Sequence, residues 1–189
     1  MNKNLITALI GLIVLAFAGY AFYQTSTRES VPGENKYRLA NKYMEEERFN
    51  EALHVFDESL SLNPSYAPSF LGKAIALMQM GRFDDARGEF DKAIALDESF
   101  AEAYANRGIL NDRTGRFEQA VSDYRKAVEL KPELNEGPGL VWRFLHLADK
   151  KPATIADRAD YIEAELKKPE SERLLSIPEI DEQQRMYKK

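Results

Sequence analysis

Few side chains in this 189-residue chain could carry out chemistry, and their spacing supports none. The two histidines, His54 and His146, do not form a His-Glu-x-x-His zinc pair. Residues 45–47 are three adjacent glutamates, which point in different directions on a helix and cannot share a cation. Residues 137–139, Gly-Pro-Gly, fall short of a phosphate-binding glycine loop. The chain has no cysteine. We therefore expect no catalytic residue, no metal and no cofactor.

The charge of the chain argues against nucleic acid as a partner. Asp and Glu number 31 against 26 Lys and Arg, which gives a net charge of −5. Nucleic-acid-binding proteins carry a basic stripe on one face, and no run of Lys and Arg interleaved with aromatic residues occurs here. We therefore expect no nucleic-acid partner.

One pattern occurs three times at a spacing of 34 residues. It starts with Arg-Phe and ends at Ala52, Ala86 and Ala120. The same register continues through three further rows: Phe56, Phe90 and Tyr124; Ser59, Ala93 and Ala127; Leu62, Leu96 and Leu130. A fixed period in this range indicates supersecondary units that stack on one another.

Each repeat predicts two helices joined by a turn. The first helices are expected over residues 36–46, 69–80 and 103–114. Gly81 and Gly115 follow the second and third of them, and glycine tolerates the left-handed conformation that ends a helix. In each second helix the alanine, the aromatic and the next small residue lie on one face. No single helix pair can bury that face, so the units must stack.

The pattern resembles the tetratricopeptide repeat (TPR) family from residue 33 to about residue 134. The resemblance implies an all-α fold, a solenoid of helix-turn-helix repeats at residues 33–66, 67–100 and 101–134. Three positions depart from the family. Lys36 replaces a large apolar residue, Glu47 replaces the turn glycine, and Glu98 replaces the closing proline.

The resemblance also implies a binding surface. In TPR proteins the first helices line a concave groove that holds a partner's peptide. Its expected residues here are Tyr37, Asn41, Met44, Leu71, Ile75, Met78, Asn106, Ile109 and Arg113. The apolar centre suits an apolar peptide or an amphipathic helix. Alternatively, these side chains pack against the first repeat or against the protein's own tail at residues 174–177.

One specialised TPR function does not fit these positions. Some family members grip the C-terminal carboxylate of chaperones with a clamp of Lys, Asn and Arg. The clamp positions here hold Tyr37, Asn41, Gly72, Glu102 and Asn106. Asn41 alone matches, and Glu102 would repel a carboxylate, so we do not expect this protein to bind such a peptide.

The N-terminal part contains 19 uncharged, mostly apolar residues at 5–23. At about 1.5 Å per residue this helix would just span a hydrocarbon core of ~30 Å. Tyr20 and Tyr23 suit the membrane interface. We expect an uncleaved transmembrane anchor at residues 1–24 and a polar linker at 25–32. The small residues Ala16 and Ala18 leave a cleavable secretory signal as the alternative.

Charges near this segment bear on its orientation. Lys3 favours a cytoplasmic start, which would place the repeats in the bacterial periplasm beside the inner membrane. Basic residues after the segment, including Arg28 and Lys42, favour the opposite orientation. Domains of this length translocate largely regardless of charge, and we therefore expect the periplasmic arrangement.

The C-terminal part predicts a divergent helix pair at residues 135–168 that caps the stack. The first helix is expected at 140–148, with Trp142 packed inside. Thr154 and Asp157 predict the start of the second. Its apolar positions follow a helical spacing: Ile155, Ala159, Ile162 and Leu166. Residues 169–189 form a charged tail.

Together these features predict a non-enzymatic, membrane-anchored adaptor that binds a peptide or helix of a partner protein, in bacterial envelope assembly. Two alternatives remain open. The protein could be a self-associating scaffold, and hence a homo-oligomer. It could also be an organellar import-type receptor whose repeats face the cytosol.

Overall fold

A computed structural model describes residues 10–20, 31–136 and 154–175. The chain divides into two compact units, Met1–Val31 and Pro32–Lys189. In the first unit residues 10–20 are helical. No helix within the described ranges is long and apolar enough to cross a membrane. Residues 5–9 and 21–23 of the expected segment 5–23 lie outside the described residues.

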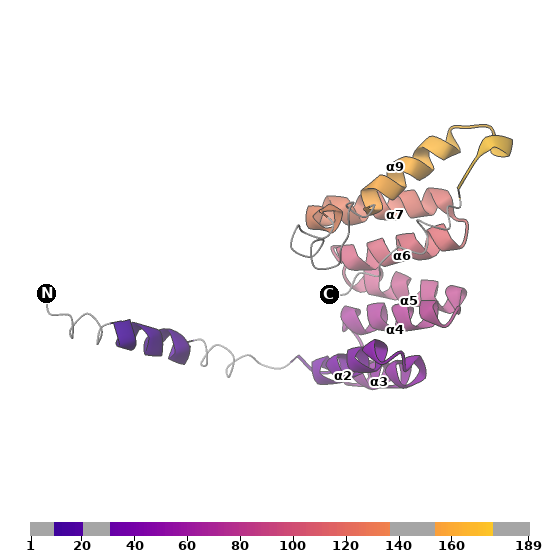
Figure 1. Cartoon of the computed structure of the whole chain (residues 1–189). Coiled ribbons are helices and arrows are strands. Elements are labelled where there is room, and N and C mark those ends of the chain that lie inside the picture. The colour runs from indigo at the N-terminus through magenta and orange to yellow at the C-terminus, as the bar shows by residue number, and fades with distance from the viewer. Residues whose placement is uncertain (1–9, 21–30, 137–153, 176–189) are drawn as a thin grey trace, which may run out of the picture. The chain divides into compact units, whose positions relative to one another are not determined.

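The second unit is a stack of paired helices (Figure 1). The pairs are α2 (Glu34–Glu45) with α3 (Phe49–Leu62), α4 (Ala67–Gln79) with α5 (Phe83–Leu96), and α6 (Ala101–Arg113) with α7 (Phe117–Leu130). A short 3₁₀ helix η1 (Pro132–Asn135), helix α9 (Ile155–Leu166) and a second 3₁₀ helix η2 (Glu170–Glu172) complete the described elements.

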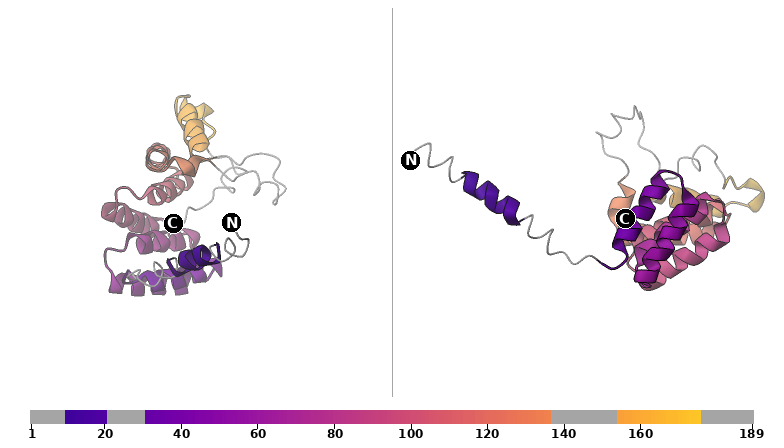
Figure 2. Two further views of the ribbon diagram at one scale, coloured as in Figure 1. Left: turned by 90° about the vertical axis from the view of Figure 1, so that its left-hand side faces the viewer. Right: turned by 90° about the horizontal axis from the view of Figure 1, so that it is seen from below.

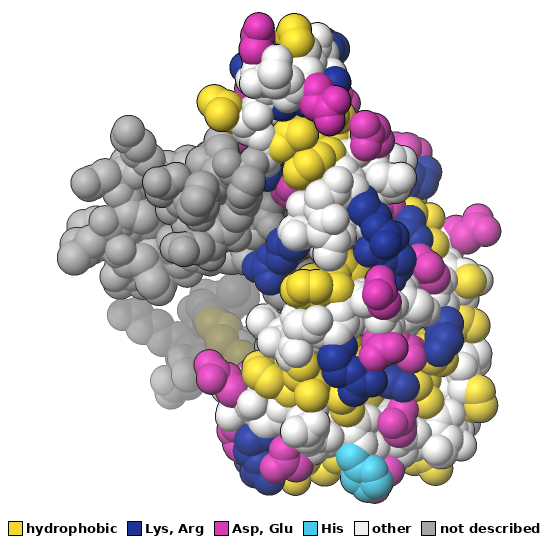
Figure 3. Space-filling view, turned by 90° about the vertical axis from the view of Figure 1, so that its right-hand side faces the viewer, with side chains coloured by type: hydrophobic (Ala, Val, Ile, Leu, Met, Phe, Trp, Pro, Cys, Tyr) yellow, Lys and Arg dark blue, Asp and Glu magenta, His cyan; other side chains and the backbone are white. Residues whose placement is uncertain are grey.

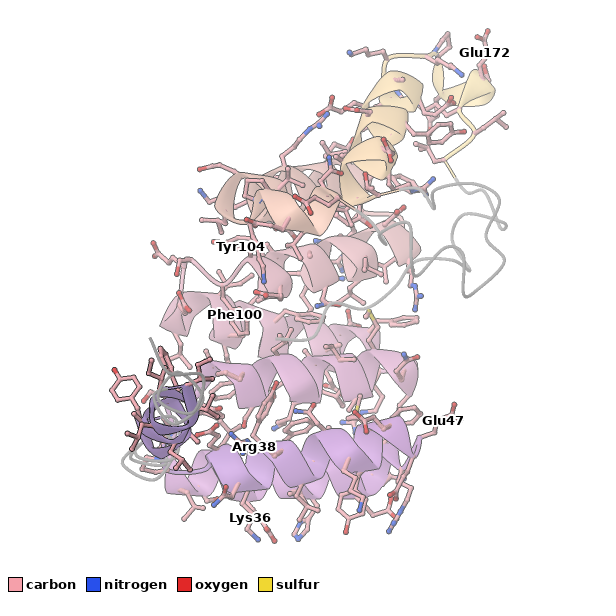
Figure 4. All side chains as sticks on the ribbon, turned by 60° about the vertical axis from the view of Figure 1, so that its left-hand side comes forward. Lys36, Arg38, Glu47, Phe100, Tyr104 and Glu172 are labelled. Atoms are coloured by element: carbon pink, nitrogen blue, oxygen red, sulfur yellow. The ribbon has the colours of Figure 1, made fainter. Side chains whose placement is uncertain are left out.

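The predicted all-α repeat architecture is confirmed. Each first helix begins two residues earlier and ends one residue earlier than predicted. The left view of Figure 2 shows the same succession of pairs from a second direction. In Figure 4, Lys36 on α2 and Glu172 in η2 mark the two ends of the stack.

The turns within the helix pairs depend on one left-handed residue each. Gly81 and Gly115 both have φ of 74°, as predicted for turn glycines. Glu47 occupies the equivalent place in the first pair and adopts φ of 57° without being glycine. The departure from glycine therefore leaves the turn unchanged, at a cost of roughly 1–2 kcal/mol for a residue that carries a Cβ.

The core lies between the helix pairs, where the repeated aromatic residues are enclosed. Phe56, Phe90 and Tyr124 are fully buried, as are the alanines that precede them by four residues. The Phe56 ring packs directly against the backbone of Gly72, since a Cβ built on this glycine would lie 2.2 Å from the ring. The expected packing of small and aromatic residues is confirmed.

Adjacent units are also tied by charge. Lys73 on α4 lies 2.7 Å from Asp57 on α3 and 3.5 Å from Glu89 on α5. Thirty-four residues later, Arg107 on α6 makes the corresponding pairs to Asp91 and Asp123. Each of these cations thus links its own repeat to the preceding one.

The described part of the cap is α9, which packs on α7. Thr154 and Asp157 form a capping box at its start, so the predicted start of this helix is confirmed. Ile155, Ala159 and Ile162 are buried. The expected first cap helix at 140–148 lies outside the described residues.

Candidate protein-interaction site

The nine predicted binding residues lie on α2, α4 and α6, three on each helix. Helix α4 contacts both α2 and α6, so the three first helices lie side by side. Residues three and four apart share one side of a helix, and the 34-residue period repeats that side from unit to unit. We call the surface carrying these nine residues the inner face.

Most of the inner face is buried. Leu71, Ile75, Met78 and Ile109 are between 1% and 3% exposed, and Asn106 is fully buried. Met44 is also buried, whereas Tyr37 and Asn41 are half-buried and Arg113 is exposed. The accessible part of the inner face therefore lies at α2 and at the end of α6. The binding role of the nine residues remains a prediction.

At α2 the inner face contains an aromatic cluster. The Tyr37 ring lies 6.0 Å from that of Phe56 and 5.6 Å from that of Tyr66, with the second pair edge to face. Burial raises the pKa of Tyr37, a hydrogen bond with Asn41 opposes this shift, and the negative charge of Glu102 adds to it. The cluster thus combines aromatic rings with polar groups on one side of α2.

At α6 the clamp position is occupied by an acid that is already paired. Glu102 is buried and accepts a hydrogen bond of 2.7 Å from Lys131. The side-chain amide of Asn106 donates to the backbone carbonyl of Glu102 at 2.7 Å. No lysine or arginine stands at the five clamp positions, so this geometry does not favour an acidic C-terminal peptide.

Asp112 was not among the nine predicted residues, yet it joins the inner face to the cap. It follows Met44 and Met78 in the 34-residue register. Arg158 on α9 donates two hydrogen bonds to its carboxylate, of 2.7 and 2.8 Å. Arg158 also donates to the carbonyl oxygen of Leu175 at 2.9 Å. A contact across 46 residues leaves no periodic signal in the sequence.

The structure also has two surface cavities between repeats that were not predicted from the sequence. One, of about 380 Å³, is lined by residues that include Lys73 and Glu89. The other, of about 260 Å³, is lined at equivalent positions, including Arg107 and Asp123. Figure 3 shows basic and acidic side chains interspersed over one face of the stack. The 34-residue spacing of these charges could have revealed them.

Neither the cavities nor the histidines suggest catalysis. Lys73, one of several charged residues that line the larger of the two cavities, is paired with Asp57. His54 is exposed and lies 3.3 Å from Glu58, whereas His146 and residues 137–139 are outside the described ranges. Among the described residues, no group of three or more His, Cys, Asp or Glu side chains could hold a metal ion.

Comparisons with known proteins agree with this geometry. Family models described as tetratricopeptide repeat match residues 33–66 and 71–135, which together make up just over half of the chain. This chain belongs to the tetratricopeptide repeat family. The resemblance inferred from the 34-residue spacing is thereby confirmed, and the inner face corresponds to the surface formed by the first helices of TPR repeats.

Solved TPR structures share the fold. The Arabidopsis OM64 TPR domain is 25% identical, with a TM-score of 0.52 over 54% of this chain and 84% of that domain. The first TPR domain of human RPAP3 is 26% identical, with a TM-score of 0.51 over 53% and 80%. The first TPR of Spaghetti (RPAP3), bound to the HSP90 peptide SRMEEVD, is 20% identical, with a TM-score of 0.58 over 74% and 97%. A search of curated proteins finds no match.

Proposed function

We propose that this TPR protein is an adaptor that binds a segment of a partner protein on its inner face. The observation that carries the proposal is the half-buried Tyr37–Asn41 pair on α2, beside the aromatic rings of Phe56 and Tyr66. Amphipathic groups at the edge of a mostly apolar face are typical of peptide-binding sites. The Spaghetti (RPAP3) domain, bound to an HSP90 peptide, supports peptide binding by this fold.

The partner segment should differ from that peptide in chemistry. An acidic C-terminus needs cations, and Glu102 replaces one here. The inner face instead offers aromatic and amide groups at α2 and an exposed Arg113 at the end of α6. We therefore propose an apolar, extended or helical segment with at most a single acidic contact.

The proposal includes a membrane tether at residues 5–23, which rests on the length of the uncharged run. A cytoplasmic N-terminus would place the repeats in a bacterial periplasm, where the adaptor would serve envelope assembly. Protease added to sealed spheroplasts tests this arrangement, because it should digest repeats that lie on the periplasmic side. Repeats that are digested only after the spheroplasts are lysed would contradict it.

Site-specific photo-crosslinking in the full chain tests the binding site. A photoreactive amino acid at Asn41 should yield a discrete protein adduct, identified by mass spectrometry. The same amino acid at His54, which is exposed on α3 of the same repeat, is the matched control. Adducts of equal yield from both positions would contradict an inner-face site, and Tyr37→Ala should reduce the Asn41 adduct.

A further inference from the structure

The described chain ends at the inner face. After η2, Leu174 donates its backbone N–H to Glu165 at 2.8 Å, and its carbonyl accepts from Tyr161 at 2.6 Å. The Leu175 carbonyl accepts from Arg158, which holds Asp112. Side chains of α9 thus hold the backbone of the chain as far as Leu175. Through Arg158 this point lies beside Asp112, which is the member on α6 of the row formed by Met44, Met78 and Asp112.

We propose that residues 176–189 of this chain lie along the inner face as an intramolecular ligand, which a partner must displace. The inference rests on the proposed function, since it assigns an occupant to the same surface. The chain's own C-terminal segment is the occupant, because the last described contact, from Arg158 to Leu175, places the start of that segment beside Asp112.

Length permits this assignment. Fourteen residues follow Leu175, and at roughly 3.3 Å per residue they reach about 46 Å when extended. Packed helices lie about 8–10 Å apart, so α2 is roughly 20 Å from α6 across α4. Seven residues suffice for that distance.

Composition also permits it. Ile177 and Ile180 are the first apolar residues after the anchor at Leu175, and Pro178 follows Ile177 directly. Proline restricts the residue before it to extended conformations, which suits a strand-like path across helices. Glu179 and Asp181 lie close to this start, and Arg113 is exposed next to Asp112.

The apolar centre of the inner face is already buried within the stack. Leu71, Ile75 and Met78 on α4 are at most 3% exposed. The helices that pack on α4 are α2, α3, α5 and α6, all members of the stack. Those helices account for the burial of these side chains, which belong to the hydrophobic core. The segment therefore finds its contact area at the half-buried Tyr37 and Asn41 and at the exposed Arg113.

Disulfide trapping tests the proposal cleanly because the full chain has no cysteine. Glu45, Gln79 and Arg113 are exposed and occupy equivalent positions beside the row of Met44, Met78 and Asp112. We expect intramolecular disulfides in the variants Q79C/E179C and E45C/E182C under mild oxidation, detected by mass spectrometry. The control A95C/E179C places the first cysteine at an exposed position on α5 and should stay reduced.

Three results would overturn the proposal. Equal trapping in the Ala95 control would mean that the segment samples the whole surface. A disulfide in the variant Q79C/K150C, with none in Q79C/E179C, would assign the inner face to residues 137–153. Disulfide-linked dimers would assign it to a second copy of the chain.

A release variant separates this inference from the adaptor function. I177D/I180D should raise the partner adduct at Asn41, by about tenfold if the segment occupies the face roughly 90% of the time. If the disulfides form but no partner adduct appears, even in the release variant, the tail occupies the inner face and the adaptor function is contradicted. If no disulfide forms and the release variant leaves the partner adduct unchanged, the adaptor function stands and the tail inference is contradicted.

Discussion

Arg158 of α9 and Asp112 of α6 form a buried ion pair that joins the cap to the last repeat. The guanidinium and the carboxylate meet through two hydrogen bonds of 2.7 and 2.8 Å, and both side chains are 3% exposed. Asp112 also accepts from the Tyr124 hydroxyl at 3.2 Å. A buried charge is tolerated only when its partner is well placed, so the stability of the cap depends on that of the third repeat.

We expect Arg158→Met to lower the free energy of unfolding by about 3–5 kcal/mol, because the buried carboxylate of Asp112 would lose its two charged hydrogen bonds from Arg158. The double variant D112L/R158M should recover most of this loss, since apolar replacements of buried ion pairs are often neutral. Urea unfolding followed by far-UV circular dichroism measures both variants. A double variant as unstable as the single one would show that the loss does not come from the uncompensated carboxylate of Asp112.

Glycine has two distinct roles in adjacent helices, and a pair of alanine variants should reveal them. Gly72→Ala should destabilise the protein by about 1–3 kcal/mol, because the new Cβ would overlap the Phe56 ring. Gly88→Ala on α5 is the control, since a Cβ there meets nothing within 4 Å. It should stabilise the helix by about 0.5–1 kcal/mol. Thermal melts of both variants measure the difference, and a common sign would contradict the packing described.

Periodicity made the stack predictable from the sequence, and the same reasoning failed where contacts are not periodic. The 34-residue rows located the helices, the turn glycines and the buried aromatics because every repeat solves the same packing problem. Met78 belongs to the same periodic pattern, but at 2% exposure it is part of the hydrophobic core and not open to a ligand. Arg158 and Asp112 pair across the end of the repeats, where no neighbouring unit supplies a template.

The bridges between repeats should differ in strength despite their equivalent positions. Arg107→Met should cost about 3 kcal/mol, since the Asp123 side chain is only 7% exposed and would keep just Asn111 as a donor. Lys73→Met should cost less than about 1 kcal/mol, because its closest partner, Asp57, is 58% exposed. Urea midpoints of the two variants test this order, and a reversed order would locate the tighter bridge in the second repeat.

Tyr37 should make stability depend on pH in the alkaline range. Burial raises its pKa, so the folded protein binds the phenolic proton more tightly than the unfolded chain, where tyrosine titrates near 10. The resulting stabilisation is complete below that pH and is lost as the pH rises through the raised value. Tyr37→Phe cannot ionise, so it should lose less stability than the wild type between pH 8 and 11. Urea unfolding at pH 8 and at pH 11 gives the change in the free energy of unfolding for each protein. The hydrogen bond to Asn41 that the variant lacks shifts its stability equally at both pH values, so it cancels from this change. Parallel losses in the two proteins would show that the Tyr37 hydroxyl is as accessible to water in the folded state as in the unfolded chain.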